Sequence, residues 1–157
     1  MTQSYHTPSA NAAVIPQPIP VKPLRPVPIA PRGKRSTILL VDDDPSVREA
    51  LRRVLVKDGW NVVTAGSGEE ALGRMQNAEP DLMITDLRMA SVSGWDLLFH
   101  EKFQRPHLPV FVITALPAQA TSDVEKFATE FFRKPLNLDA LLLAVHRYLG
   151  VPETVPK

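Results

Sequence analysis

The chain has 157 residues, a length typical of one domain, and its 18 Lys and Arg residues nearly balance 17 Asp and Glu residues, for a net charge of +1. So small a net charge argues against direct binding of nucleic acid, and the absence of cysteine excludes disulfides, cysteine nucleophiles and cysteine-ligated zinc. No apolar run approaches the roughly 20 residues that a membrane span needs, and the N-terminus lacks a secretory signal, so the composition predicts a cytoplasmic protein.

The first 35 residues differ in composition from the rest of the chain. They hold five Lys or Arg residues, no Asp or Glu, and half of the 16 prolines. Because proline lacks the backbone donor and fixes φ, neither helix nor sheet propagates through such a run. Residues 1–35 are therefore predicted to form a disordered, basic, extended arm. This arm is either a solvated leader or a docking peptide, since several of its prolines have the PxxP spacing.

From Thr37 onward, short apolar runs alternate with amphipathic segments. Five runs have the length and branched residues of buried strands, and they occupy 38–41, 61–64, 81–85, 109–113 and 130–133. Segments with helical spacing follow them, at 45–58, from 67 through 75, and at 94–105, 122–128 and 137–149. Residues 151–157 form a short C-terminal tail.

Particular residues mark where these helices begin and end. Asp44 is predicted to cap the first helix, with Pro45 in its first turn, and Gly59 is predicted to end it. Ser67 is predicted to cap the second helix. The last helix is expected to bury one apolar stripe, made of Leu138, Leu141, Leu142, Val145 and Leu149.

Five strands alternating with five helices predict an α/β fold, in which helices cover both faces of a parallel sheet. In such doubly wound folds the ligand site lies at the carboxyl ends of the strands, near the point where the strand order reverses. The residues at those ends are Asp42 and Asp43 after the first strand, Asp86 after the third, Thr114 after the fourth and Lys134 after the fifth.

Three carboxylates at one edge of a sheet repel one another unless a cation neutralises them. Oxygen ligands without cysteine or a histidine pair favour Mg²⁺. A cation, a lysine and a hydroxyl around one carboxylate would stabilise the charge of a transferring phosphoryl group. The residues thus predict phosphoryl transfer onto a carboxylate, with Asp86 as the nucleophile.

Five segments, in order and in register, carry a family resemblance. They are ILLVDDDPSVR, TAGSGEEAL, DLMITDLRM followed by SGWDLL, VFVITAL, and FFRKPLNLDALL. Because of these five segments, residues 36–150 resemble the receiver domain of bacterial two-component response regulators, the CheY-like domain. The resemblance implies a flavodoxin-like (βα)5 fold with strand order 2-1-3-4-5.

The resemblance also implies a metal site and a phospho-acceptor. Asp86 would accept the phosphoryl group. Mg²⁺ would be bound by Asp42, Asp43 and Asp86, with Asp42 acting largely through water, and by the backbone carbonyl of Arg88.

The remaining matched residues have implied roles in switching. Thr114 and Lys134 would contact the phosphoryl group, and Pro135 would set the loop that presents Lys134, usually through a cis peptide bond. Phe131 occupies the position of an aromatic switch residue. It would turn inward when Thr114 moves, and so repack the face built by the fourth helix, the fifth strand and the fifth helix.

The sequence also departs from the family pattern. Ala90 stands where the family usually has proline, the segment between Thr114 and Lys134 is about two residues shorter, and Phe127 and Ala128 replace a small Gly-Ala pair. These changes affect the fourth helix and leave the phosphoryl site intact. Leu116 occupies a position whose side chain tends to set the lifetime of the phosphoryl group in this family. Because leucine cannot position an attacking water, we expect slow self-dephosphorylation.

The leading hypothesis is a stand-alone response regulator, since only seven residues follow Gly150. It would take a phosphoryl group from a histidine kinase or a phosphotransfer protein of a phosphorelay and signal to a downstream protein target, with homodimerisation possible. It would not be an enzyme beyond its own phosphorylation and dephosphorylation. The alternatives are a non-switching interaction module and a Mg²⁺-dependent phosphohydrolase with an aspartyl-phosphate intermediate, which normally carries a cap domain.

Overall fold

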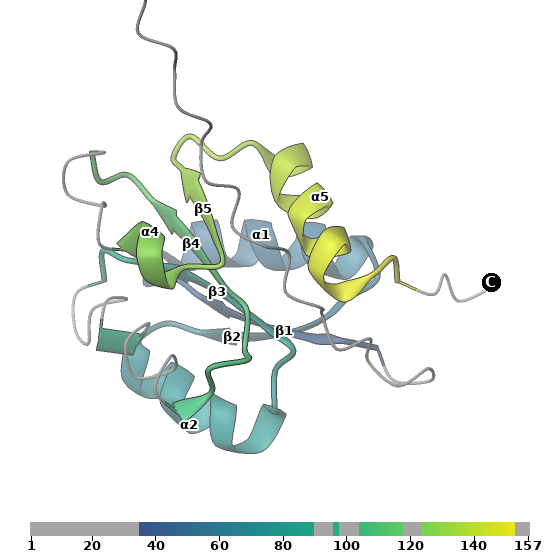
Figure 1. Ribbon diagram of the computed structural model, residues 1–157, viewed down its shortest axis with the longest axis horizontal. Coiled ribbons are helices and arrows are strands. Elements are labelled where there is room, and N and C mark those ends of the chain that lie inside the picture. The colour runs from purple at the N-terminus through teal and green to yellow at the C-terminus, as the bar shows by residue number, and fades with distance from the viewer. Residues whose placement is uncertain (1–34, 90–95, 98–103, 118–123, 153–157) are drawn as a thin grey trace, which may run out of the picture.

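The order of elements follows the predicted alternation of strands and helices (Figure 1). The computed structural model describes residues 35–89, 96–97, 104–117 and 124–152. Within them lie β1 (Thr37–Val41), α1 (Pro45–Lys57), β2 (Asn61–Ala65), α2 (Gly68–Ala78), β3 (Leu82–Asp86), β4 (Val110–Thr114), α4 (Val124–Phe127), β5 (Glu130–Arg133) and α5 (Leu138–Leu149). Some predictions fall outside the described residues. They concern residues 1–34 of the arm, Ala90, most of the helix at 94–105 and the start of the helix at 122–128.

The five strands form one parallel sheet in the order β2-β1-β3-β4-β5, which confirms the predicted fold class. The chain leaves β1 for the edge strand β2 and returns to β3 on the other side of β1, so the strand order reverses at β1 and β3. The register places Asp86 opposite Ile113 and Thr114 opposite Arg133. The ends of β3, β4 and β5 are therefore level, and this edge is where a doubly wound sheet binds its ligand.

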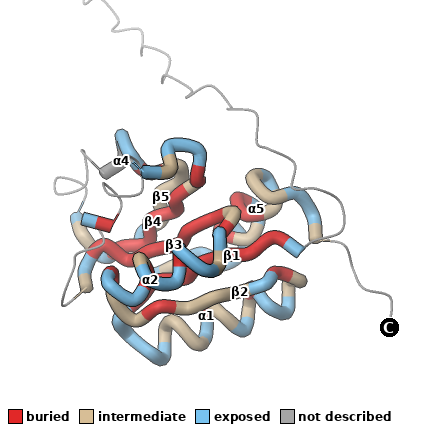
Figure 2. The backbone as a smooth tube through the Cα atoms, turned by 90° about the horizontal axis from the view of Figure 1, so that it is seen from below, coloured by how far each residue is buried: buried red, intermediate tan, exposed pale blue. Residues whose placement is uncertain are grey.

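Two apolar clusters pack on opposite faces of the sheet. Side chains of β1 alternate between them: Ile38 and Leu40 join the cluster with α1 and α5, while Leu39 and Val41 join the cluster with α2. Figure 1 shows α2 and α5 on opposite sides of the sheet, and Figure 2 shows the buried residues concentrated along β1, β3 and β4. Because both faces are covered, the central strands β1, β3 and β4 are buried along their whole length and do not alternate between buried and exposed residues.

The predicted ends of the first helix and the predicted cap of the second are confirmed. The Asp44 side chain accepts hydrogen bonds from two backbone N–H groups of α1, and the Ser67 hydroxyl accepts one from Glu70 in α2. Gly59 follows α1 with a φ of 106°, and a Cβ atom there would lie 2.9 Å from the Cβ of Pro152. Both the backbone conformation and the close approach therefore require glycine at this position.

The predicted apolar stripe on α5 is only partly correct. Leu141 and Val145 are buried and Leu142 and Leu149 pack partly against the core, but Leu138 is 41% exposed. Leu138 is the first residue of α5, where the chain enters the helix, and its side chain belongs to neither core cluster.

Candidate functional site

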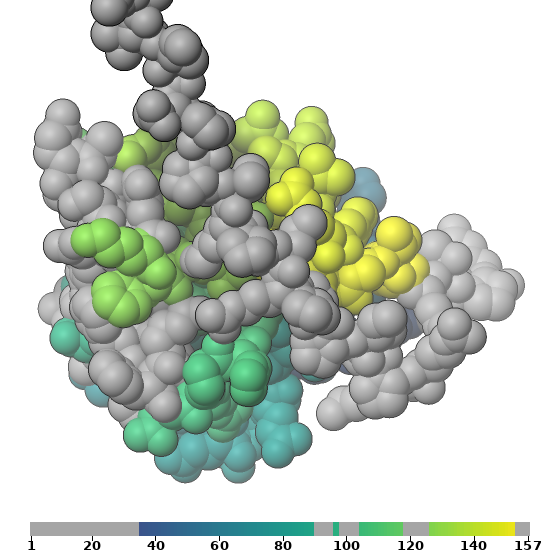
Figure 3. Space-filling model, viewed as in Figure 1, coloured from purple at the N-terminus to yellow at the C-terminus, as the bar shows by residue number. Residues whose placement is uncertain are grey.

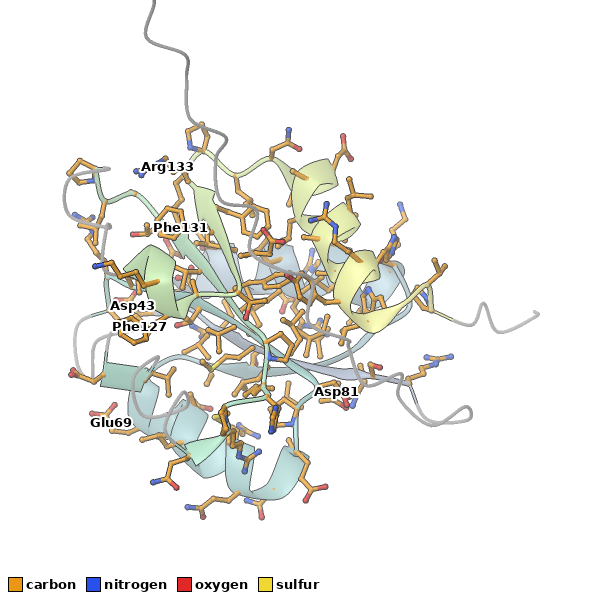
Figure 4. All side chains as sticks on the ribbon, in the orientation of Figure 1. Asp43, Glu69, Asp81, Phe127, Phe131 and Arg133 are labelled. Carbon is orange, nitrogen blue, oxygen red and sulfur yellow. The ribbon has the colours of Figure 1, made fainter. Side chains whose placement is uncertain are left out.

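The predicted site residues lie at the carboxyl edge of the sheet. Asp42 follows β1, Asp86 ends β3, Thr114 ends β4 and Lys134 follows β5. Figure 4 shows Asp43, next to Asp42, on the same side of the molecule as Phe131 and Arg133 of β5, with Asp81 at the opposite end of β3. The fold thus gathers on one edge residues that are up to 92 positions apart in the chain.

Lys134 joins the two buried carboxylates of the site. Its Nζ lies 2.5 Å from Oδ2 of Asp86 and 3.5 Å from Oδ2 of Asp42. The two aspartates are only 7% and 3% exposed. Burial by itself lowers the pKa of Lys134, but the hydrogen bond to Asp86 and the charges of both aspartates outweigh it, so the pKa of Lys134 is raised. The lysine is therefore held as a cation at this edge.

Burial is the largest influence on the pKa of Asp42. Burial raises the pKa of Asp42, and the hydrogen bond from the Asp44 N–H, 2.8 Å from Oδ1, together with the charge of Lys134, only partly offsets this. The charge of Asp86 raises the Asp42 pKa further. The backbone carbonyl of Asp42 accepts a hydrogen bond from the Arg48 guanidinium, a residue that the sequence interpretation did not single out.

Asp86 is fixed on both of its carboxylate oxygens. Oδ1 accepts a hydrogen bond from the Arg88 N–H at 2.9 Å, while Oδ2 contacts Lys134. Its backbone carbonyl accepts a hydrogen bond from the buried Thr85 hydroxyl. The Arg88 side chain is exposed. A carboxylate held in one orientation at the carboxyl edge of the sheet is suited to attack an electrophile.

Thr114 and the Lys134–Pro135 turn are linked through the backbone. Thr114 is fully buried, and its Oγ1 accepts a hydrogen bond from the Leu116 N–H at 3.2 Å. Its carbonyl accepts one from the Lys134 N–H at 2.9 Å. The Lys134–Pro135 peptide bond is cis, as the family resemblance implied.

Phe131 is half-buried and packs against the same core cluster as Leu116. The Arg133 guanidinium lies 5.3 Å from the centre of the Phe131 ring and donates a hydrogen bond to the Leu116 carbonyl at 2.8 Å. The sequence interpretation did not identify Arg133. Its position two residues after Phe131 on one strand, hence on the same face, is the signal that could have drawn attention to it.

The oxygen donors at this edge are of the kind that binds Mg²⁺. Across the part of the chain that is described, no group of three or more His, Asp or Glu side chains is arranged to hold a metal. Lys134 instead contacts Asp42 and Asp86, and Asp43 is exposed. Two buried carboxylates that share one ammonium group still leave a negative charge, and burial of Asp42 makes that charge costly. An oxygen-bound dication fits this chemistry.

Replacing Asp42 by Asn should raise the free energy of unfolding at pH 7 in metal-free buffer. The folded-state pKa of Asp42 lies above its ordinary value of 3.8, so its contribution to stability is fully present below that pH and is lost as the pH rises through the folded pKa. Asparagine removes the charge and keeps Oδ1 for the Asp44 N–H. Urea denaturation should show the gain at pH 7, and the gain should shrink as the pH falls towards 3.8.

Asp139→Asn is the matched control, because Asp139 is an exposed carboxylate in the first turn of α5. It should lose up to about 1 kcal/mol through the weaker interaction with the helix dipole. Equal losses in both variants at pH 7 would contradict the assigned cost of burying Asp42.

Comparison with known proteins gives concordant matches. The model of the response regulator receiver domain family matches residues 38–146. The transcriptional regulatory protein GlrR of Escherichia coli is 36% identical over 115 residues, which cover 71% of this chain and 26% of GlrR. The probable transcriptional regulatory protein TcrX of Mycobacterium tuberculosis is 29% identical, over 74% of this chain and 51% of TcrX. The chain thus spans from about a quarter to about half the length of these curated relatives.

Solved structures match over most of their own length. A response regulator receiver protein from Pseudomonas putida is 34% identical, with a TM-score of 0.69 over 73% of this chain and 98% of that one. The response regulator TrrA of Thermotoga maritima, crystallised in complex with Mg²⁺ and BeF, is 31% identical, with a TM-score of 0.68 over 73% of this chain and 99% of that one. Within the described residues, no helix combines the length and the apolar character that crossing a membrane requires.

Proposed function

The chain belongs to the response regulator receiver domain family, and we propose that it accepts a phosphoryl group on Asp86 from a phosphorylated histidine of a partner protein. The observation that carries this proposal is the contact of Lys134 with the buried carboxylates of Asp86 and Asp42, at the edge where the strand order reverses. The phosphorylated form then signals through contact with a downstream protein target.

The chemistry follows from the groups on this edge. An oxygen of Asp86 attacks phosphorus, the new P–O bond forms as the P–N bond to the donor imidazole breaks, and the imidazole leaves with its electron pair and takes up a proton. Lys134 turns from Oδ2 of Asp86 to a phosphoryl oxygen, and the Thr114 hydroxyl donates to another. These two groups hold the added negative charge on the acyl phosphate.

Mg²⁺ is the cofactor that the proposal requires. Asp42, Asp43 and Asp86 and the backbone carbonyl of Arg88 would hold it, and the bound ion would neutralise charge on the phosphoryl oxygens. The complex of the Thermotoga maritima relative with Mg²⁺ and BeF supports this assignment. The raised pKa of Asp42 supports it too, because a dication would offset the cost of burying this carboxylate.

A non-switching interaction module is the second candidate. The exposed position of Asp43 and the lack of a three-ligand metal cluster among the described side chains favour it. The two candidates differ in whether the chain takes up a phosphoryl group at all.

Phosphoramidate tests the proposed function, because its P–N bond resembles that of phosphohistidine. With Mg²⁺, we expect the chain to take up one phosphoryl group per molecule from phosphoramidate and to release no nitrophenol from p-nitrophenyl phosphate. Failure to take up phosphoryl would favour the interaction module. Repeated turnover of p-nitrophenyl phosphate would instead indicate a phosphohydrolase.

A further inference from the structure

The peptide unit of Leu116, just after β4, is held at both of its polar atoms. Its N–H donates to Oγ1 of Thr114 at 3.2 Å, and its carbonyl accepts from Nη1 of Arg133 at 2.8 Å. The same guanidinium lies 5.3 Å from the centre of the Phe131 ring. Thr114, Leu116, Arg133 and Phe131 therefore form one continuous set of contacts, from the buried end of β4 to the surface of β5.

The strand geometry explains why Arg133 can make both contacts. Phe131 and Arg133 lie two residues apart on β5, so their side chains point to the same face of the sheet. Arg133 is also paired with Thr114 in the register of β4 and β5, which brings its side chain beside the loop that begins at Ala115. Figure 4 shows Phe131 and Arg133 side by side on this edge.

The contacts of Arg133 are weak enough to be broken by a ligand. The guanidinium is exposed, and a cation–π contact at an exposed site changes an equilibrium constant by about two- to fivefold. An exposed hydrogen bond to a carbonyl adds a factor of similar size. Together they are worth about 5- to 25-fold, which shifts a population without locking it.

We propose that Arg133 is a positioning residue that holds Leu116 and Phe131 in their arrangement in the phosphoryl-free protein, and that phosphorylation of Asp86 releases it. The proposal rests on the function proposed above. Movement of Thr114 towards a phosphoryl group on Asp86 draws Leu116 with it, because the two are hydrogen-bonded. The Leu116 carbonyl then leaves Arg133, and Phe131 loses the cation that lies over its ring.

This arrangement connects the buried site to a surface that a partner can reach. Figure 3 shows α4 and α5 exposed on the same side of the molecule, and β5 lies between them in the chain. A contact that exists only in the phosphoryl-free state opposes phosphorylation. Its removal should therefore favour the other state by the same factor that the contact contributes.

The test follows Phe131 in the full-length chain by ¹⁹F NMR, with fluorophenylalanine at all six phenylalanines and the Phe131 signal assigned from Phe131→Leu. Spectra are recorded without ligand and with Mg²⁺ plus beryllium fluoride, a phosphoryl mimic. The variants are Arg133→Gln and, as a second variant that keeps the positive charge but not the planar group, Arg133→Lys. Arg53→Gln is the matched control, because Arg53 is an exposed α1 arginine paired with Glu49.

We expect the ligand-free Phe131 signal of Arg133→Gln to move towards the position it has in the liganded wild type, and that of Arg133→Lys, which keeps a cation, to move in the same direction but less far. For Arg133→Gln this corresponds to an increase of about 5- to 25-fold in the ratio of that state to the other. The Arg53→Gln signal should stay at the wild-type position. Ligand-free Phe131 signals identical to wild type in both Arg133 variants would overturn the proposal while leaving phosphoryl transfer intact. A wild-type spectrum that does not respond to Mg²⁺ and beryllium fluoride would overturn the proposed function and the role of Arg133 with it.

Discussion

Replacing Asp86 by Asn should slow phosphoryl uptake by about 100-fold or more, because an amide is not an effective nucleophile towards phosphorus. The replacement is nearly isosteric. Asparagine keeps the Oδ1 atom that accepts the hydrogen bond from the Arg88 N–H. The rate of mass increase of the intact protein, incubated with Mg²⁺ and a small acyl phosphate, measures the effect.

Asp81→Asn is the matched control for this variant. Asp81 lies at the opposite end of β3, where its Oδ2 accepts a hydrogen bond from the Thr37 N–H at 2.8 Å. The control should take up phosphoryl at the wild-type rate. Uptake by Asp86→Asn at the same rate as Asp81→Asn would show that Asp86 is not the acceptor.

Replacing Phe111 by Ala should lower the free energy of unfolding by about 3–5 kcal/mol. Phe111 lies on β4, between β3 and the edge strand β5, and is fully buried. Its ring centre lies 5.8 Å from that of Phe132 on β5 and 5.4 Å from that of Tyr148 on α5, so its loss opens a cavity between three elements. Because β4 also carries Thr114, the variant should lose phosphoryl uptake as it unfolds.

Urea denaturation measures the free energy of unfolding of Phe111→Ala and of Leu143→Ala, which is the matched control. Leu143 lies on α5 and is 62% exposed, so its truncation should change the free energy of unfolding by no more than about 0.5 kcal/mol. The loss expected for Phe111→Ala is a large part of the 5–15 kcal/mol that stabilises a typical domain. Equal effects of the two truncations would contradict the assignment of Phe111 to the core that α5 covers.

The strands and the helix ends could be predicted because their signals are local. An apolar run such as 38–41 has the length of a buried strand, and the capping roles of Asp44 and Ser67 need only the next few residues. The alternation of strands and helices then predicted the parallel sheet. The prediction that Leu138 is buried was wrong. Helical spacing identifies an apolar stripe, but it does not show whether the first residue of the helix reaches the core.

The site residues could be placed at one edge of the sheet, since parallel strands bring their carboxyl ends together. Their individual contacts could not be predicted. The double contact of Lys134 with Asp42 and Asp86 depends on the turn after β5, and the sequence does not show which carboxylates its side chain reaches.

Contacts between distant parts of the chain left no pattern in the sequence. Asp58 and His146 are 88 residues apart, yet Nε2 of His146 lies 2.7 Å from Oδ2 of Asp58, which also accepts a hydrogen bond from the Trp60 indole. For Arg133, the two-residue spacing from Phe131 indicates a shared face of β5, but nothing in the sequence shows its contact with the Leu116 carbonyl. The packing of β4, β5 and α5 gives these residues their partners.

Proteolytic mapping of the phosphoryl group tests the central claim most directly. The wild-type chain is incubated with a small acyl phosphate, once with Mg²⁺ and once with a chelator, and its mass is measured intact and after digestion. The account predicts one added phosphoryl group, located on the peptide that contains Asp86 and absent from the chelated sample. A phosphoryl group on any other peptide, or equal uptake in the presence of the chelator, would contradict it.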